Sequence, residues 1–361
     1  MVTVIPVDKE ERTVSILTLH KIRKGEVRLV MKTIGVLTSG GDSPGMNAAV
    51  RGVLRAAFHH GLSVCGIRQG YKGLLHEDIV PMKPYMAGGI VHRGGTILKT
   101  ARCLEFKEEN MQKKAADILR KHHIDGLVVI GGDGSLKGAE ALYRQGISVV
   151  TLPGTIDNDM PGTDETIGFD SAVNTVLQAV HKIRDTASSH DRAAVVEVMG
   201  RHAGHIALAA GLACGAEYIL VPEVPFSREK LAVSLEEQMK AGRTNSIVIC
   251  AEGADDGRAL GMWLKERTDI DICMTNLGYV QRGGEPTARD AILGGVLGAS
   301  AVEALTVHGF THHVVGVERS RVIYTPYEQA EEKRRTFSRP LYDLAAMLGA
   351  AQDEFSIEEK F

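Results

Sequence analysis

Three aspartates in two glycine-containing turns are the residues of this sequence best suited to chemistry on a phosphate group. Asp133 lies in the motif GGDGS, and Asp157 and Asp159 lie in PGTIDND. Each motif directly follows an apolar run typical of a buried β-strand. In an open α/β sheet, ligands bind outside the carboxyl ends of the strands. The two turns are therefore expected to form one site for a nucleotide, its metal and a second substrate.

Phosphoryl transfer needs a base for the attacking hydroxyl and a metal ion against the charge that develops on the phosphate. Asp157 suits the base, whereas Asp133 or Asp159 suits the metal, because carboxylate oxygens are the ligands that Mg²⁺ prefers. The alternatives are that Asp133 only caps a helix and that Asp157 and Asp159 are ordinary turn residues. Their joint occurrence, about twenty residues apart, favours the catalytic interpretation.

Glycines in these turns leave room for phosphate groups against the backbone. Gly132 and Gly134 flank Asp133, and Ser135 opens the next predicted helix. A second turn, SGGDSPGMN at 39–47, joins a strand-like run to a helix, where backbone N–H groups favour phosphate. The turn matches neither the Walker A motif nor GxGxxG. A phosphate contact and a tight strand-to-helix connection without a ligand are equally good interpretations of it.

Arginines beside glycine turns are candidates for binding a second phosphate, because the guanidinium donates two parallel hydrogen bonds. Each alone is more often a surface ion pair. The candidates are Arg102, Arg192, Arg201 in MGRHAG and Arg282 in QRGG. Glu252, at the end of SIVICAEG, is placed to accept a hydrogen bond from a substrate hydroxyl.

The elements that position these residues alternate between strands and helices. Strands are expected at 33–38, 62–67, near 78–82, 126–131, 148–152, 193–198, 218–222, 246–251 and, as the final strand, 312–319. Helices are expected at 107–122, 135–145, 168–187, 286–308 and 339–350. This alternation predicts an α/β fold with mostly parallel sheets in two stacked three-layer domains. Residues 1–30 lack caps or a period and are expected to be a disordered extension or a wrongly assigned start.

The composition is that of an ordinary globular protein. The chain has 361 residues, of which 44% are apolar and 24% charged, and its net charge is −3. That balance gives no reason to expect nucleic acid or a membrane as partner. The five cysteines have no CxxC spacing, which indicates reduced thiols of a cytoplasmic protein. We expect no membrane span, since no apolar run reaches the roughly 18 residues required.

The motifs, taken together and in this order, resemble the phosphofructokinase family of the bacterial type. They are LTSGGDSPGMN, YKGL, HRGGT, VIGGDGS, LPGTIDND, RDTASSHDR, VEVMGRHAG, VPE and QRGG. The resemblance implies that the γ-phosphoryl group of ATP is transferred, with Mg²⁺, to the 1-hydroxyl of fructose 6-phosphate in glycolysis. It also implies a cytoplasmic, allosteric homotetramer with active sites at subunit interfaces. The implied domains are an ATP-binding domain at 31–168 plus 281–331, a sugar-phosphate domain at 169–280 plus 332–350, and a tail at 351–361.

Carried over residue by residue, the resemblance assigns roles to specific side chains. Around ATP it implies Gly41, Arg102, Cys103, Gly132, Asp133, Gly134 and Ser135, with Asp133 serving magnesium. Around the sugar phosphate it implies Thr155, Asp157, Asp159, Arg192, Met199, Gly200, Arg201, Glu252, Tyr279 and Arg282. Catalysis would use Asp157 as the base with Thr155 and Arg201, and Arg192 would reach a neighbouring subunit. An effector, ADP or phosphoenolpyruvate, would meet Arg51, Arg55, Arg184, Glu217 and Arg243.

Four positions depart from the pattern of ATP-dependent bacterial members. Cys273 stands where a second intersubunit Arg is usual, and Tyr279 where His is usual. Loss of a charge-assisted phosphate bond costs on the order of 1.5–3 kcal/mol, which lowers sugar affinity tenfold or more. Pro84 and Ala241 replace common basic residues of the effector site, so allosteric control is expected to be weak or absent.

Two positions indicate the phosphoryl donor. Members of the family that use pyrophosphate typically carry Asp and Lys where this chain has Gly134 and Gly154, so ATP is favoured. Two alternatives to fructose 6-phosphate phosphorylation remain. One is a paralogue for another sugar phosphate, such as tagatose 6-phosphate or sedoheptulose 7-phosphate, suggested by Cys273 and Tyr279. The other is a non-catalytic regulatory subunit, against which the presence of Asp133 and Asp157 argues.

Overall fold

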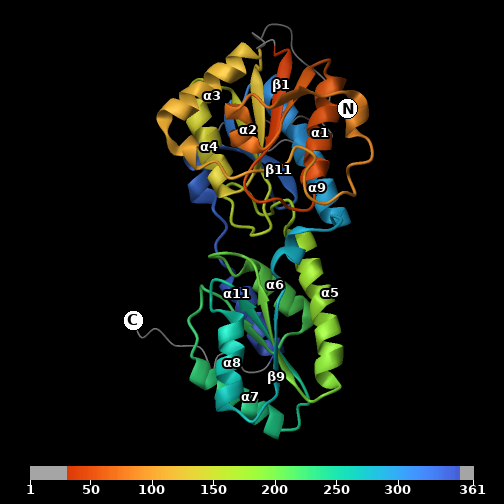
Figure 1. Cartoon of the computed structure of the whole chain (residues 1–361), viewed down its shortest axis with the longest axis vertical. Helices are drawn as coiled ribbons and strands as arrows, with labels where there is room; N and C mark the ends of the chain where they lie inside the picture. Colours follow the sequence, from red (N-terminus) through yellow and green to blue (C-terminus); the bar gives the residue numbers. More distant parts are fainter. Residues whose placement is uncertain (1–30, 350–361) are drawn as a thin grey trace, which may run out of the picture. The chain divides into compact units, whose positions relative to one another are not determined.

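The computed structural model describes residues 31–349, and the predictions for 1–30 and 351–361 lie outside them (Figure 1). The described chain forms two compact units. The first comprises 31–155, 159–168 and 285–335, and the second comprises 156–158, 169–284 and 336–349. The sequence placed the later divisions at 280/281 and 331/332. The compact units of the described chain divide at 284/285 and 335/336; Gln281 bonds within the second unit and Arg334 within the first.

The first unit is built on a seven-stranded sheet in the order β11-β10-β5-β4-β1-β2-β3. Its strands are β1 Thr33–Thr38, β2 Ser63–Ile67, β3 Ile79–Pro81, β4 Gly126–Gly131, β5 Val149–Pro153, β10 His312–Glu318 and β11 Arg321–Pro326. The central pairs are parallel, whereas β3 and β11 run antiparallel at the edges. The expectation that 312–319 is the final strand was therefore wrong, since β11 follows it.

Helices cover both faces of this sheet, as Figure 1 shows for α1 and α9 on one side and α3 and α4 on the other. They are α1 Met46–His59, α2 Gly70–Leu75, α3 Glu109–Lys121, α4 Asp133–Arg144, α9 Ala288–Glu303 and α10 Tyr327–Ala330, with the short turns η1 Pro84–Ala87, η2 Leu104–Lys107, η4 Ala304–His308 and η5 Glu331–Lys333. Val36 of β1 enters the core under α1 and α9, and Leu37 enters the core under the other helices. Alternate side chains of one strand thus bury both faces.

One helical span among the described residues, Ala288–His308, is long and apolar enough by length and composition to cross a membrane. This corrects the expectation that no such stretch exists. The span is apolar because α9 packs closely against α1. A Cβ on Gly52 would lie 2.4 Å from the carbonyl oxygen of Gly295. A helix buried between a sheet and another helix is apolar for the same reason as a membrane span.

The second unit contains a four-stranded parallel sheet in the order β7-β8-β6-β9. Its strands are β6 Ala193–Val198, β7 Tyr218–Leu220, β8 Ser246–Ala251 and β9 Ile272–Asn276. Its helices are α5 Phe169–Ser188, α6 His205–Cys214, α7 Arg228–Lys240, α8 Gly257–Arg267 and α11 Arg339–Leu348, with the short turn η3 Gly278–Arg282. Two separate apolar clusters fill the two faces of the sheet. The predicted α/β class with mostly parallel sheets is confirmed for both units.

Candidate active site

The glycine turns that are predicted to bind a nucleotide lie where the strand order of the first unit reverses. From β1 the chain runs to β2 on one side, and β4 pairs with β1 on the other. Thr38 of β1 lies opposite Ile130 of β4, so both strands end at the same level. The Ser39 N–H donates to the Ile130 carbonyl at 2.9 Å. Such a switch point is where open α/β sheets bind ligands.

Asp133 is the first residue of α4, directly after the strand end of β4. Its carboxylate lies 2.7 Å from the Lys137 ammonium and 3.0 Å from the Arg334 guanidinium. Partial burial by itself raises the pKa of Asp133, but hydrogen bonds from Lys137 and Arg334 outweigh it, so that the pKa is lowered. The Asp133 carboxylate is therefore ionised at neutral pH, and its oxygen atoms can coordinate a metal ion.

The single carboxylate of Asp133 suits a metal ion that is held mainly by the phosphates of a bound substrate and by water. Within 31–349, no group of three or more His, Cys, Asp or Glu side chains could hold a metal. Mg²⁺ is commonly bound through one or two carboxylates, water and substrate phosphates. Gly134 adds the space that phosphates need, because a Cβ built there would meet no heavy atom within 4 Å. The residues present therefore fit a magnesium–polyphosphate group.

The other two glycines of the motif, and Ser135, pack the turn. A Cβ on Gly131 would lie 2.4 Å from the Ser135 hydroxyl oxygen, so only glycine fits there. Gly132 is packed more loosely, since its Cβ would lie 3.5 Å from that of Thr155. Ser135 is buried, and its carbonyl accepts a 2.6 Å hydrogen bond from the Tyr71 hydroxyl. The Ser135 side chain is thus buried beside Gly131, where it packs against the backbone of the turn.

The loop at 93–103 is tied to the turn after β1, which contains Gly41. The Thr100 hydroxyl donates to the Gly40 carbonyl at 2.6 Å, and the Asn47 amide donates to the Arg93 carbonyl at 2.9 Å. Arg102 is exposed and Cys103 is half-buried, and burial raises the pKa of the Cys103 thiol. The two motifs that the sequence separates by fifty residues therefore lie together.

The motif PGTIDND is divided between the two units. Thr155 and Asp159 belong to the first unit and Asp157 to the second. The Thr155 carbonyl accepts a 2.6 Å hydrogen bond from the Thr166 hydroxyl. The Asp159 carbonyl accepts a short hydrogen bond from Arg334, the same side chain that pairs with Asp133. Arg334 therefore links the two acidic motifs, and it was not among the residues predicted from the sequence.

In the second unit, Asp157 and Arg201 form the central pair. Asp157 is 4% exposed, and its Oδ2 lies 3.3 Å from Nε of Arg201. Arg201 follows β6 with a left-handed backbone, φ 53°, in a turn that begins at Gly200, φ 143°. A buried carboxylate beside a cation is an arrangement that can hold an anionic base and stabilise nearby charge.

Side chains from neighbouring strand ends hold this turn. Oε1 of Glu252, which follows β8, accepts hydrogen bonds from the N–H groups of Gly200 at 3.3 Å and Arg201 at 2.8 Å. The Met199 N–H donates to Oε1 of Gln281 at 3.2 Å. Glu252 thus has a backbone partner besides the sugar hydroxyl predicted for it, and Gln281 was missed although it lies in the QRGG motif.

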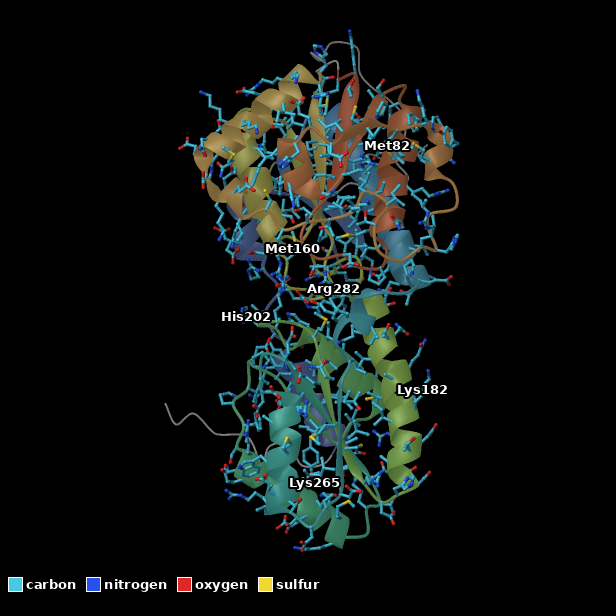
Figure 2. All side chains as sticks on the ribbon, in the orientation of Figure 1. Met82, Met160, Lys182, His202, Lys265 and Arg282 are labelled. Atoms are coloured by element: carbon cyan, nitrogen blue, oxygen red, sulfur yellow. The ribbon has the colours of Figure 1, made fainter. Side chains whose placement is uncertain are left out.

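The residues predicted to bind a sugar phosphate follow the carboxyl ends of several strands: Thr155, Asp157 and Asp159 come after β5, Met199, Gly200 and Arg201 after β6, Glu252 after β8, and Tyr279 and Arg282 after β9. Arg192 is the exception, since it precedes β6. Figure 2 labels His202, next to Arg201, and Arg282 at one end of the second unit. Tyr279 is 80% exposed, and the Arg282 guanidinium lies 5.7 Å from its ring centroid. Arg192 pairs with Asp271 at 2.5 Å.

Cys273 lies on β9 and is half-buried. Burial raises the pKa of its thiol, an effect that the nearby Arg192 charge opposes. A neutral thiol at this position offers no cation for a phosphate.

The predicted effector residues fall into two groups. Arg184 and Arg243 of the second unit both pair with the buried Glu217, at 3.1 and 2.9 Å, and the Ile247 N–H donates to the same carboxylate at 2.7 Å. Arg51 and Arg55 are exposed on α1 of the first unit. The positions that lack a basic residue, Pro84 in η1 and Ala241 after α7, are both exposed.

A family model described as Phosphofructokinase matches residues 33–305. The chain belongs to the phosphofructokinase family. It is 51% identical to the ATP-dependent 6-phosphofructokinase of Clostridioides difficile (strain 630) and 49% identical to that of Shouchella clausii (strain KSM-K16). Each match extends over 318 residues and covers 88% of this chain and 99% of the relative. The family resemblance expected from the motifs is thereby confirmed.

Solved structures agree with the fold. The phosphofructokinase from Saccharomyces cerevisiae matches with a TM-score of 0.78 at 37% identity, over 87% of this chain and 50% of that chain. This chain therefore spans about half the length of that yeast chain. A pyrophosphate-dependent phosphofructokinase from Nitrosospira multiformis matches with a TM-score of 0.79 at 20% identity, over 92% and 95% of the two chains, which shows the fold alone.

Proposed function

We propose that this chain is an ATP-dependent 6-phosphofructokinase, which transfers the γ-phosphoryl group of ATP to the 1-hydroxyl of fructose 6-phosphate. The products are fructose 1,6-bisphosphate and ADP. The observation that carries the proposal is the buried Asp157 carboxylate paired with Arg201, in a chain 51% identical to an enzyme of that name. An anionic base held beside a cation is what phosphoryl transfer to an alcohol requires.

The first unit is proposed to bind ATP. The residues proposed to contact ATP are Gly41, Arg102, Cys103, Gly132 and Gly134, with Asp133 for the metal. Bound Mg²⁺ supplies charge neutralisation of the phosphates. Arg334 and Lys137 fix the Asp133 carboxylate, so its direction is set before ligand arrives. Because Ser135 is buried, we assign to it the support of the turn rather than a direct phosphate contact.

The second unit is proposed to bind the sugar phosphate and to supply the base. Asp157 accepts the proton of the 1-hydroxyl as its oxygen attacks phosphorus, and Thr155 of the same motif is proposed as a further catalytic residue. Arg201, paired with Asp157 at 3.3 Å, orients the carboxylate and stabilises charge on the transferring group. Asp159 supports the same loop through its carbonyl bond to Arg334.

The sugar itself is proposed to contact Met199, Gly200 and Glu252, and its phosphate is proposed to meet Arg282 and Tyr279. Arg192 is assigned to the phosphate bound by a neighbouring copy in a homotetramer, and Asp271 fixes its position. With Cys273 neutral, we expect weaker sugar binding than in members with Arg there.

The donor is proposed to be ATP, and the packing around the two diagnostic glycines supports this. The space beside Gly134 is open. A Cβ on Gly154 would lie 3.0 Å from Cγ2 of Ile130 and 3.1 Å from Cε of Met46, so a lysine would force these neighbours to move. We further propose that the enzyme is cytoplasmic, acts in glycolysis, and binds ADP or phosphoenolpyruvate at most weakly through Arg51, Arg55, Arg184, Glu217 and Arg243.

The direct test is product analysis with the purified full-length chain, Mg²⁺, ATP and fructose 6-phosphate. Phosphorus NMR should show fructose 1,6-bisphosphate and ADP in equal amounts. Asp157→Ala should abolish product formation, whereas Glu236→Gln, which removes an exposed ion pair on α7, should not. If the wild-type chain formed no bisphosphate, the proposed function would be rejected.

A further inference from the structure

Gln281 is a fully buried amide that connects two separate loops of the second unit. It is 0% exposed, at the end of η3 between Tyr279 and Arg282. Its Oε1 accepts the Met199 N–H at 3.2 Å, and its Nε2 donates to the Gly278 carbonyl at 3.1 Å. Both ends of the amide are therefore paired with backbone, as a buried polar group requires.

The first loop that Gln281 contacts is the turn from Met199 to Gly204, which holds Arg201 in a conformation that it would not adopt unaided. The Ala203 N–H donates to the Gly200 carbonyl at 3.0 Å, closing the turn, and Arg201 sits at φ 53°. A left-handed non-glycine residue persists only where its surroundings fix it. Gln281 fixes the amide before this turn, and Glu252 fixes the next two.

The second loop is η3 itself, which carries Tyr279 and Arg282. Gly278 is left-handed at φ 49°, and its carbonyl is the one that Gln281 holds. The Leu277 N–H donates to the Glu197 carbonyl of β6 at 3.1 Å, so η3 is anchored to the same strand that leads into the Arg201 turn. One buried side chain thus joins the loop that presents Arg201 to the loop that presents Tyr279 and Arg282.

We propose that Gln281 is a positioning residue for the phosphoryl transfer, fixing the distance between Arg201 with its Asp157 partner and the phosphate-binding side chains Tyr279 and Arg282. The inference rests on the proposed function, because it assigns those side chains to fructose 6-phosphate. The separation of the reacting hydroxyl from the sugar phosphate is fixed by the substrate. A site that binds both ends must therefore hold its two loops at a matching distance.

The first test compares Gln281→Met with the wild-type chain. Methionine is close to glutamine in shape but makes neither hydrogen bond, so the Met199 N–H and Gly278 carbonyl lose their partner. We expect kcat/KM for fructose 6-phosphate to fall at least about tenfold, while KM for ATP changes by less than about twofold. Gln178→Met, at an exposed position of α5, is the matched control and should keep wild-type kinetics. A folded Gln281→Met protein with wild-type kcat/KM would overturn the proposal.

The second test uses Gln281→Glu, which separates positioning from mere packing. A protonated glutamic acid can accept from the Met199 N–H and donate to the Gly278 carbonyl, whereas the carboxylate cannot donate. Burial favours the protonated form. The activity of Gln281→Glu relative to wild type should therefore rise as the pH is lowered from 8.5 to 6, and a constant ratio would contradict the assigned hydrogen bonds.

The third test asks whether Gln281 acts through its neighbours. In the background of Arg282→Ala, adding Gln281→Met should lower kcat/KM by clearly less than it does alone. Full additivity would overturn the proposal. Faster amide exchange at 199–204 and 278–282 in Gln281→Met reports the same link without any activity. If the wild-type chain were inactive on fructose 6-phosphate, the proposed function would fail, but amide exchange would still show whether Gln281 links the two loops.

Discussion

Substitution of Gly134 by Asp tests directly whether the turn after β4 receives the donor phosphates. The position is the second residue of α4, and a Cβ there meets nothing within 4 Å. The side chain therefore fits without moving the protein. Asp is a somewhat better helix residue than Gly, and an acid in the first turn stabilises a helix by about 0.3–1 kcal/mol. Repulsion from Asp133 offsets part of this gain, so the free energy of unfolding should stay within about 1 kcal/mol of wild type.

The effect on ATP should be much larger. A carboxylate about 5 Å from a phosphate charge is repelled by about 3 kcal/mol at an effective dielectric constant of about 20. Because residue 134 is exposed, solvent reduces this value. We therefore expect kcat/KM for ATP to fall by a factor of roughly ten to a hundred. An unchanged free energy of unfolding would show that the lower kcat/KM comes from repulsion of ATP at this turn and not from loss of folded protein.

The assay is a steady-state ATP titration at saturating fructose 6-phosphate, combined with thermal unfolding. Gly134→Ala is the matched control, since its methyl group also enters open space but adds no charge. It should keep kcat/KM within a few-fold of wild type and stabilise the helix by up to about 1 kcal/mol. If Gly134→Asp were folded and used ATP as well as the wild-type chain, the donor phosphates would not lie at this turn.

Three further predictions concern other parts of the chain. Asp157→Asn should lower kcat by about 10²–10⁴-fold with little change in KM for ATP, because an amide cannot accept the hydroxyl proton; near-normal turnover in steady-state kinetics would exclude Asp157 as the base. Arg334→Gln should lower the free energy of unfolding by about 1 kcal/mol and raise KM for Mg-ATP, because Asp133 loses a partner at 3.0 Å. Chemical denaturation measures the first effect and ATP titration the second. Arg334→Lys should give intermediate values of both, and wild-type values for Arg334→Gln would contradict the assigned role. Burial lowers the pKa of His313 to about 4, so the unfolded chain binds a proton that the folded chain does not, and stability should fall as the pH drops from about 6.5 to 4. His313→Phe should remove on the order of 3 kcal/mol of this pH dependence, and identical denaturation profiles of the two proteins would refute it.

The central strands could be predicted from the sequence because they are buried on both faces. β4 and β8, for example, are buried at every residue, and nearly all of their residues are apolar or glycine. β9 was missed because it is an edge strand with alternating exposure and contains Cys273 and Asn276. Edge strands bury only part of their surface, so they carry a weaker apolar signal.

β11 was missed for a different reason, which lies in the turn that precedes it. Arg319 and Ser320 join β10 to β11, and both have positive φ, 48° and 64°. Two-residue hairpins of this conformation usually contain Asn-Gly or Asp-Gly. Arg-Ser gives no such signal, so the hairpin became visible only in the structure.

For the site, residue types identified candidates but not their partners. Asp133, Asp157 and Arg201 could be selected because acids and arginines in glycine turns after strands have few structural uses. Arg334 could not, since it lies in a charged stretch two hundred residues after Asp133 and looks like an ordinary surface residue. Gln281 was overlooked because a glutamine carries no charge, although burial makes its two hydrogen bonds important.

The central claim, an ATP-dependent kinase of fructose 6-phosphate, is tested most directly by one matrix of kcat/KM values. ATP and pyrophosphate are each paired with fructose 6-phosphate, tagatose 6-phosphate and sedoheptulose 7-phosphate. We predict the highest value for ATP with fructose 6-phosphate. A higher value for pyrophosphate would contradict the donor assigned from Gly134 and Gly154, and a higher value for another sugar would contradict the assigned acceptor.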